Sequence, residues 1–541
     1  MSRAKTTLAL LALLFLSPPL LGQTVGQVQF ANSGAAAAQA DFLHGLAQLH
    51  NFEYEDAAAA FQRAEKADPG FAMAYWGEAM TANHPIWQEQ DLEAGRAALA
   101  RLAATPAERA ARAGSDREKA YLAAVEVLYG AGTKEDRDAR YAAAMGELAG
   151  RYPEDVDAQA FYALSLLGTA HEGRDIPTYM RSAAVLEEVL CRAPEHPGVL
   201  HYLIHSYDDP QHAPLGLRAA RRYARVAPDA GHAQHMTSHI FLALGLWDET
   251  VDANLAAMAA VNRAREARGM HHRSCGHYAF WLHYGYLQQG RFGEARKVLD
   301  ACRDEAQHAG HSGSLTMRKG SDPLDPDTTS LGSFAAMRLR HLLDTGEWSS
   351  EVASWPVEPG DLLGARLTLD FTAAFAALEA GRLEEARAAA GRFEAARRDL
   401  EVELAKASSG SSNQRKRAEI LSLELAARLA WAEGQREPAL ATLERAAAEE
   451  DGLPFAFGPP FVDEPSHELL GELLLAAGKP AEAEKAFERA LARAPRRVRS
   501  LLGLARAQKA AGHPEAAGET SALLHQIRHA ADRELEAPNG R

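Results

Sequence analysis

The sequence predicts an all-α protein built as a solenoid of stacked helix pairs, and two observations lead to this prediction. Aromatic residues make up only 7% of the 541 residues, alanine is abundant, and runs of β-branched residues are almost absent. This composition favours helices over strands. In addition, a set of small residues, one phenylalanine and one proline recurs at the same offsets near both ends of the chain. Stacked helical hairpins produce internal repeats of this kind.

The first 22 residues have the pattern of a secretory signal peptide. Arg3 and Lys5 precede an apolar run from Leu8 to Leu16, which is too short to span a bilayer. No other long apolar stretch follows in the sequence. We therefore expect an exported protein, periplasmic or extracellular, with no membrane insertion after the signal is removed.

The net charge excludes one class of partner, and the number of cysteines excludes a disulfide framework. The formal net charge is −15 at pH 7, and loss of Arg3 and Lys5 with the signal would make it −17. Because nucleic-acid binding requires a basic surface, we exclude that class of partner. The three cysteines are too few to form a disulfide framework, and the sequence does not choose a pairing among Cys191, Cys275 and Cys302. We expect Cys275 to be a lone buried thiol rather than a metal ligand or a nucleophile.

The repeat is clearest when its first and last copies are compared. The N-terminal copy carries its marker residues at Gly45, Ala57, Phe61, Ala64 and Pro69. The C-terminal copy keeps the same offsets at Gly471, Ala483, Phe487, Ala490 and Pro495. Middle copies keep a Gly-x4-Ala turn, and Gly478 recurs 34 residues later as Gly512. This pattern resembles the tetratricopeptide repeat, which implies a right-handed superhelix of helix pairs with a concave groove.

A wider resemblance is carried by Asp68-Pro69, Ala74 to Gly77, His84-Pro85 and the run from His201 to Pro210. These segments are similar to an exported bacterial tetratricopeptide-repeat family that has no assigned chemistry. The resemblance supports the fold and adds no mechanism.

The repeat pattern also divides the chain. We predict a signal peptide at 1–22, an N-terminal solenoid with a histidine-rich groove at 23–302, an irregular insertion with connecting helices at 303–365, and C-terminal repeats at 366–541. Four stretches break the period: a charged helical insertion at 88–140, a loop at 308–332, a mobile polar segment at 407–418 and a proline-rich connection at 452–466. Long loops of this kind either connect helices on the surface or act as a lid over the groove.

Histidines are concentrated in one part of the chain. Residues 196–283 hold half of the 22 histidines, several of them three or four residues apart and thus on one helix face. In the tetratricopeptide frame, His201, His205 and Asp208 fall at positions 5, 9 and 12 of a first helix, which point into the groove. His232, His235 and His239 fall at positions 2, 5 and 9 of the next repeat.

We predict that this set binds a divalent transition metal such as zinc, copper or iron. His201, His205, His235 and His239 are the expected ligands, and Asp208 or His232 completes or orients the site. The alternative is that these histidines are hydrogen-bonded structural groups, or contacts to a partner segment in the groove. Further residues predicted to contact such a segment are His50, His84, Tyr202, Tyr207, Asp209 and His277.

The sequence therefore favours an exported scaffold whose groove binds a protein or peptide segment, a divalent transition metal, or both. The alternative function is a metal-dependent hydrolase or oxidoreductase that uses the same histidines, with Asp208 or Asp209 as the general base. The chain has no HExxH, Cys-x2-Cys or glycine-rich phosphate motif, so we assign no catalytic residue. We interpret His467 and Glu468 as a helix cap or a surface pair.

Overall fold

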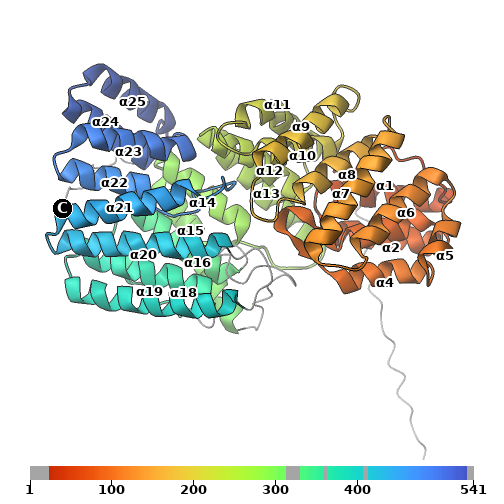
Figure 1. Ribbon diagram of the computed structural model, residues 1–541, viewed down its shortest axis with the longest axis horizontal. Coiled ribbons are helices and arrows are strands. Elements are labelled where there is room, and N and C mark those ends of the chain that lie inside the picture. Colours follow the sequence, from red (N-terminus) through yellow and green to blue (C-terminus); the bar gives the residue numbers. More distant parts are fainter. Residues whose placement is uncertain (1–22, 312–328, 359–361, 406–411, 533–541) are drawn as a thin grey trace, which may run out of the picture.

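The computed structural model describes residues 23–311, 329–358, 362–405 and 412–532, and these residues form an all-α solenoid (Figure 1). The first elements are α1 (Ala36–His50), α2 (Tyr54–Ala67), α3 (Ala72–Met80), β1 (Asn83–His84), η1 (Pro85–Trp87), β2 (Glu89–Gln90), α4 (Leu92–Leu102), α5 (Pro106–Arg112), α6 (Asp116–Leu128), α7 (Lys134–Arg151), α8 (Val156–Leu167) and α9 (Ile176–Leu190). The two short strands pair antiparallel, with Asn83 opposite Gln90.

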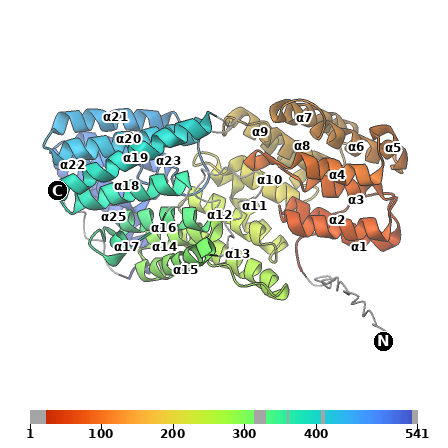
Figure 2. The same cartoon turned by 90° about the horizontal axis from the view of Figure 1, so that it is seen from below.

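The middle of the chain forms α10 (Pro197–Tyr207), α11 (Ala213–Val226), α12 (Gly231–Ala243), α13 (Trp247–Ala267), α14 (His277–Gln289) and α15 (Phe292–His311). The C-terminal part forms α16 (Ser330–Thr345), α17 (Glu351–Ser354), α18 (Leu363–Glu379), α19 (Leu383–Leu404), α20 (Ser412–Ala432), α21 (Arg436–Asp451), α22 (Ser466–Ala476), α23 (Pro480–Arg493), α24 (Val498–Ala511) and α25 (Pro514–Ile527). Seen from below, α1–α7 lie at one end, α18–α23 at the other, and α10–α13 between them (Figure 2).

The all-α solenoid predicted from the sequence is confirmed, and the marker residues explain how its helix pairs pack. Phe61 on α2 is fully buried, and a Cβ added to Gly45 or Gly77 would lie only 3.0 or 2.4 Å from its ring. Phe487 has the same relation to Gly471 and Gly503 at the C-terminal end. Each phenylalanine therefore needs glycine on both flanking first helices, which is why the spacing recurs.

Several expectations about the irregular stretches can now be compared with the structure. The signal peptide at 1–22 and residues 312–328 of the expected loop lie outside the described residues. The prediction of a mobile polar segment at 407–418 is wrong from residue 412 onward, because α20 begins at Ser412. The connection at 452–466 is irregular up to residue 465, as predicted. No described helix combines the length and the apolarity that a membrane crossing requires.

The last helices turn back onto the middle of the solenoid. The backbone N–H of Asp532 donates to the carbonyl of Gly290 (3.0 Å), and the Trp247 indole N–H donates to the carbonyl of Arg496 (3.2 Å). A hydrophobic cluster joins Trp247 and Trp281 to the C-terminal helices through Val498, Leu501, Leu524 and Ile527. The C-terminal repeats are therefore held against α13 and α14 rather than standing free.

Arg497 is the polar group at the centre of this junction. Its side chain is 1% exposed and donates to Glu468 (2.9 Å), to Asp344 (2.9 Å) and to the hydroxyl of Tyr284 (3.2 Å). These partners lie on α22, α16 and α14. Glu468 is itself buried, so its interpretation as a cap or surface residue was wrong. One guanidinium thus connects four helices of the C-terminal half.

We predict that Arg497→Met lowers the free energy of unfolding by about 3–5 kcal/mol, because it removes the cation paired with the buried carboxylate of Asp344 and the closer of the two arginines at Glu468. Urea unfolding of the purified protein measures this loss. Arg489→Met is the matched control, since Arg489 is 63% exposed and pairs with Asp451 at 2.6 Å. Its loss should cost less than about 1 kcal/mol. Equal stability of both variants would contradict the assigned role of Arg497.

Candidate metal centre

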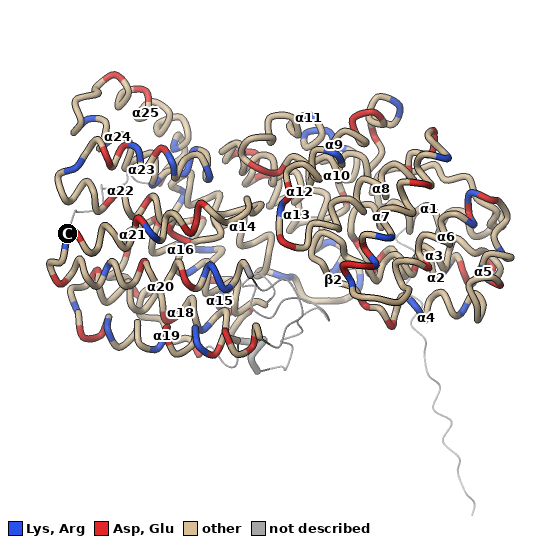
Figure 3. The backbone as a smooth tube through the Cα atoms, viewed as in Figure 1, with Lys and Arg blue, Asp and Glu red and all other residues tan. Residues whose placement is uncertain are grey.

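Three first helices of successive repeats carry the histidines into the interior. Within their bounds, α10, α12 and α14 have no Lys, Arg, Asp or Glu, and they are drawn without charged residues in Figure 3. Every residue of α10 and α12 is buried. Imidazoles on these helices are therefore polar groups in an otherwise uncharged interior, where each ring nitrogen needs a partner.

The side chains form one continuous row, which we call the histidine column: His201, His205, His232, His235, His239 and His277. Neighbouring ring centroids are 4.9 Å apart for His201 and His205, 5.8 Å for His205 and His239, 5.0 Å for His239 and His235, and 4.5 Å for His235 and His277. His232 is 5.1 Å from His201 and 6.2 Å from His235. The structure thus brings all the predicted histidine ligands together and adds His277.

The column divides into two groups rather than one four-histidine site. His201, His205 and His232 each place one potential ligand atom within 4.8 Å of the others, and so do His235, His239 and His277. A third group, His205, Asp208 and His239, links the two. We had expected His201, His205, His235 and His239 to share one ion, and this arrangement instead separates them into neighbouring groups.

The tautomers of His235 and His239 follow from their hydrogen bonds. Asn254 donates its amide N–H to the Thr250 carbonyl (2.8 Å), so its oxygen accepts from Nδ1 of His235 (2.8 Å). The Asp208 carboxylate accepts from Nδ1 of His239 (3.0 Å). Both Nδ1 atoms therefore carry the proton, and both Nε2 atoms are bare. These Nε2 atoms face each other at 3.2 Å.

A proton between the two Nε2 atoms would require an imidazolium in this interior. Burial opposes that charge and holds the pKa of His235 and of His239 well below the usual range, with neighbouring histidines lowering it further. Two electron pairs at this separation repel each other unless a cation lies between them. The two Nε2 atoms could therefore hold a cation between them.

A nearby group of two histidines and one aspartate differs from the column in its hydrogen bonding. His50 and His196 both donate from Nε2 to Asp157, at 2.9 and 3.3 Å. Nδ1 of His50 accepts from the Tyr202 hydroxyl (3.0 Å), and Nδ1 of His196 accepts from the backbone N–H of Val199 (3.4 Å). Burial lowers the pKa of His50 to about 4. Every nitrogen of these rings is satisfied, so this triad is a structural hydrogen-bond network.

Asp208 supplies the negative charge beside the column. It is 2% exposed, forms an ion pair with Arg174, and accepts from His239. Arg174 also lies 3.5 Å from Asp209 and is stacked over Tyr179. Burial lowers the pKa of Arg174. Asp208 therefore orients His239, as the sequence predicted, and its charge is balanced by an arginine that sequence reasoning missed.

Two aromatic side chains from outside the histidine helices cover the column. The Phe457 ring, in the irregular connection at 452–465, stacks on His239 with centroids 5.1 Å apart. The ring of Phe52, between α1 and α2, has its centroid 4.3 Å from that of His201 and 5.5 Å from that of His232. The connection at 452–465 thus acts as a cover, one of the two roles expected of it. The sequence analysis did not single out Phe52.

The residues predicted to contact a partner segment lie mostly in the interior. His50, Tyr202, Tyr207 and Asp209 are buried, and each is held by an internal hydrogen bond. His84 is half-buried, stacks on Tyr54 at 4.0 Å and does not join the column. Their contact with a partner segment stays a prediction.

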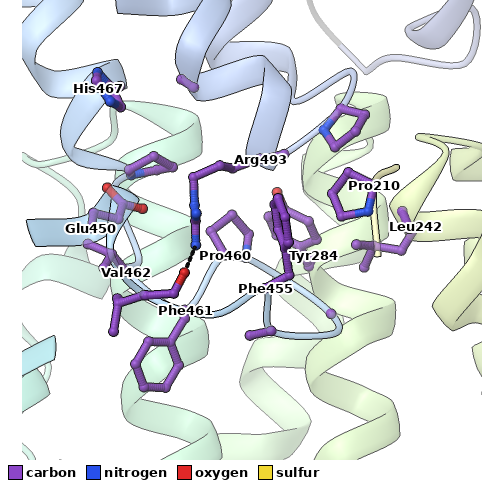
Figure 4. Close-up of a pocket in the computed structure, with 18 of the residues that line it drawn as sticks. Pro210, Leu242, Tyr284, Glu450, Phe455, Pro460, Phe461, Val462, His467 and Arg493 are labelled. Carbon is purple, nitrogen blue, oxygen red and sulfur yellow. Dashed lines mark hydrogen bonds between the residues drawn. The ribbon is translucent and has the colours of Figure 1, made fainter. Parts of the chain in front are cut away.

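A cavity of about 60 Å³ adjoins the column and is shown in Figure 4. Its wall includes Asp208, Leu242 and Tyr284 from the histidine-bearing part of the chain. The opposite wall includes Phe455 and Arg493, with Arg493 donating to the carbonyl of Leu453 (3.1 Å). The volume is sufficient for several water molecules.

The structure gives the disulfide pairing that the sequence left open. Cys275 and Cys302 form a disulfide, and Cys191 is free and exposed. The expectation that Cys275 is a lone thiol was therefore wrong. The bond joins Cys275, two residues before α14 begins at His277, to Cys302 on α15.

Comparison with known proteins agrees with the repeat pattern. The tetratricopeptide-repeat family model matches residues 474–532, and no curated protein matches the chain. The chain is similar to the APC/C hetero-tetramer Cut9–Hcn1 (12% identity over 88% of this chain and 78% of that one, TM-score 0.34). It is also similar to the human IFIT1 dimer with m7Gppp-AAAA (14%, 93% and 92%, 0.32) and to the P58(IPK) TPR domain (12%, 88% and 99%, 0.22).

The family match identifies tetratricopeptide repeats at residues 474–532, and stacked helix pairs of the same kind make up most of the rest of the described chain. Solenoids of this class present extended surfaces to protein partners, so the fold supports a role in protein–protein interaction. None of the structural likenesses carries a particular partner or ligand over to this chain.

The cavity wall also contains a carboxyl group that should make stability depend on pH. Burial raises the pKa of Glu450 to about 7, although its side chain accepts from the Ser466 backbone N–H (2.7 Å). A raised folded-state pKa gives stability that is present below the unfolded value near 4.5 and is lost as pH rises through 7.

We predict that Glu450→Gln removes much of the loss of stability between pH 5 and pH 8, a difference of about 3 kcal/mol at most. Thermal unfolding at both pH values measures it. Glu449→Gln is the control, because Glu449 is exposed and adjacent in sequence. If both variants keep the pH profile of the wild type, the titration of Glu450 does not control stability.

Proposed function

We propose that this tetratricopeptide-repeat protein binds a transition metal ion, zinc, copper or iron, through His235, His239 and His277. The observation that carries the proposal is the pair of bare Nε2 atoms 3.2 Å apart. Two imidazole nitrogens bound to one tetrahedral ion, each about 2.0–2.1 Å from it, lie about 3.3 Å from one another. The observed spacing therefore fits a metal chelate with little movement.

The groups around the pair support this proposal. Metal-binding imidazoles commonly donate the other ring N–H to a carboxylate or a carbonyl oxygen, which fixes their orientation. Asp208 and Asn254 hold His239 and His235 in this way. Asp208 also supplies a negative charge near the ion, while Arg174 limits the net charge that is buried. Partner binding by the solenoid is then a separate activity of its outer surfaces.

Elemental analysis of the purified protein tests the proposal. We predict at least one equivalent of a transition metal in the wild type and the loss of one equivalent in His239→Gln. Asn254→Leu, which removes only the group that orients His235, should weaken metal affinity by about 10–100-fold. His212→Gln is the control, since His212 hydrogen-bonds Asp209 (2.9 Å) outside the column. Wild-type protein without metal after incubation with zinc, copper and iron would refute the proposal.

A metal-dependent hydrolase or oxidoreductase is the second candidate, and one observation favours it. The cavity of Figure 4 has Asp208 in its wall, so a small substrate there would lie beside the residue that holds His239. Turnover that disappears in His239→Gln together with the metal would favour the enzyme. A metal-loaded protein without hydrolytic or oxidative activity would favour a binding role.

We also propose that the protein is exported. The signal-like sequence at residues 1–22 motivates this, and the Cys275–Cys302 disulfide supports it, because such bonds persist in oxidising compartments. Detection of the protein in the periplasm or medium tests the proposal, and retention in the cytoplasm would refute it.

The disulfide should contribute to stability. It closes a loop with a sequence separation of 27 residues, for which chain entropy gives about 3–4 kcal/mol. We predict that Cys302→Ser lowers the free energy of unfolding by this order, measured by urea unfolding. Cys191→Ser is the control and should leave stability unchanged, since Cys191 is free and exposed. Equal stability of Cys302→Ser and wild type would exclude this contribution.

A further inference from the structure

We propose that His201, His205 and His232 hold a second metal ion, so that the histidine column is a two-metal centre with three imidazoles for each ion. The inference rests on the proposed function at His235, His239 and His277 and extends it to the neighbouring group.

The first argument is the convergence of unsatisfied nitrogens. His201 donates from Nδ1 to the carbonyl of His50 (2.6 Å), which leaves its Nε2 bare. Among the described residues, Nε2 of His201, of His205 and of His232 has no hydrogen-bond partner. Each of these side chains is at least nine-tenths buried, and one potential ligand atom of each lies within 4.8 Å of the others. A buried polar atom left unpaired is destabilising, and here three occur together.

The second argument is the contrast with the adjacent structural triad. His50 and His196 are buried to the same degree, yet all four of their ring nitrogens have partners. This interior therefore satisfies histidines that have a structural role. His201, whose Nδ1 binds the backbone of His50 itself, is satisfied on one edge only. One ring nitrogen of each of the three column histidines lies within 4.8 Å of the others, a spacing that a common ion can bridge.

The third argument is the backbone at Phe52. Phe52 lies five residues before Ala57, in the turn between the two helices of its repeat. The equivalent turn position in two other repeats is a glycine: Gly290, five residues before Ala295, and Gly245, five residues before Thr250. The glycines have φ of +73° and +64°, and Phe52 has φ of +58°. A left-handed conformation is unfavourable for a bulky residue, whereas glycine adopts it freely. In this position the Phe52 ring packs against His201, His205 and His232.

The ligand set favours an ion of low charge. Three neutral imidazoles bring no negative charge to the ion. The Asp208 carboxylate, 3.6 Å from the Nδ1 atom of His205, is already paired with Arg174, and the Glu53 carboxylate accepts from the backbone N–H of His232 (2.9 Å). None of the three ligands itself neutralises the ion, and the cost of burying an ion among apolar and aromatic side chains rises with the square of its charge. Imidazole is a suitable ligand for copper. We therefore assign copper(I) to this second position in preference to a divalent ion.

The experiment is metal titration of the mature, full-length protein after removal of bound metal, with copper(I) under anaerobic conditions and with zinc(II) in parallel. We expect two equivalents of copper(I) in the wild type, one in His232→Gln, one in His239→Gln and none in the double variant. His84→Gln is the control, because His84 stacks beside the site on Tyr54 without joining it. It should keep both equivalents.

The two levels of the proposal fail in different ways. One equivalent in the wild type that His232→Gln leaves unchanged would overturn the second site and leave the proposed function intact. No bound metal at all would overturn both. Zinc that fills both positions and excludes copper(I) would overturn the choice of ion. Copper K-edge absorption of the wild type needs no variant: three nitrogen neighbours per copper are expected, and two or fewer would refute the three-imidazole sites.

Discussion

Burial keeps the imidazoles of α10 and α12 neutral, and a neutral imidazole has one N–H and one bare nitrogen. Each histidine on these helices therefore needs a donor as well as an acceptor, in a region whose own helices provide no charged side chain. His50 and His196 meet this requirement with Asp157, Tyr202 and the backbone. The column does so on its Nδ1 edges only, at His201, His235 and His239. The proposed metal ions would use the nitrogens that remain bare.

The fold was predictable because its marker residues act over one or two helices. The ring of Phe61 excludes any side chain at Gly45, and the turn glycines take a left-handed backbone, so local spacing reports the helix pair directly. The histidines were predictable for the same reason, since positions three and four apart on one helix must share a face. Asp208 was found through this spacing as well, one turn after His205.

The remaining parts of the site depend on contacts between distant segments, which spacing does not encode. Phe457 reaches His239 from the C-terminal half, and Arg174 reaches Asp208 from the turn between α8 and α9. The division of the column into two groups depends on where side chains of α10, α12 and α14 meet, which spacing within one helix does not specify. Asn254 had an accessible signal, because it lies on the second helix of the same repeat as His235.

The cover provided by Phe457 has a consequence for the order of events during synthesis. About 170 residues separate the end of α14 from Phe457, and translation at about 5–20 residues per second takes roughly 10–30 seconds to add them. During that interval the histidine-bearing helices are complete while the ring that stacks on His239 does not yet exist. A proposed ion that bound before this ring was in place would meet an uncovered His239, whereas one that bound later would have to displace the connection at 452–465. The order of segments in the sequence therefore places the cover after the helices that it covers.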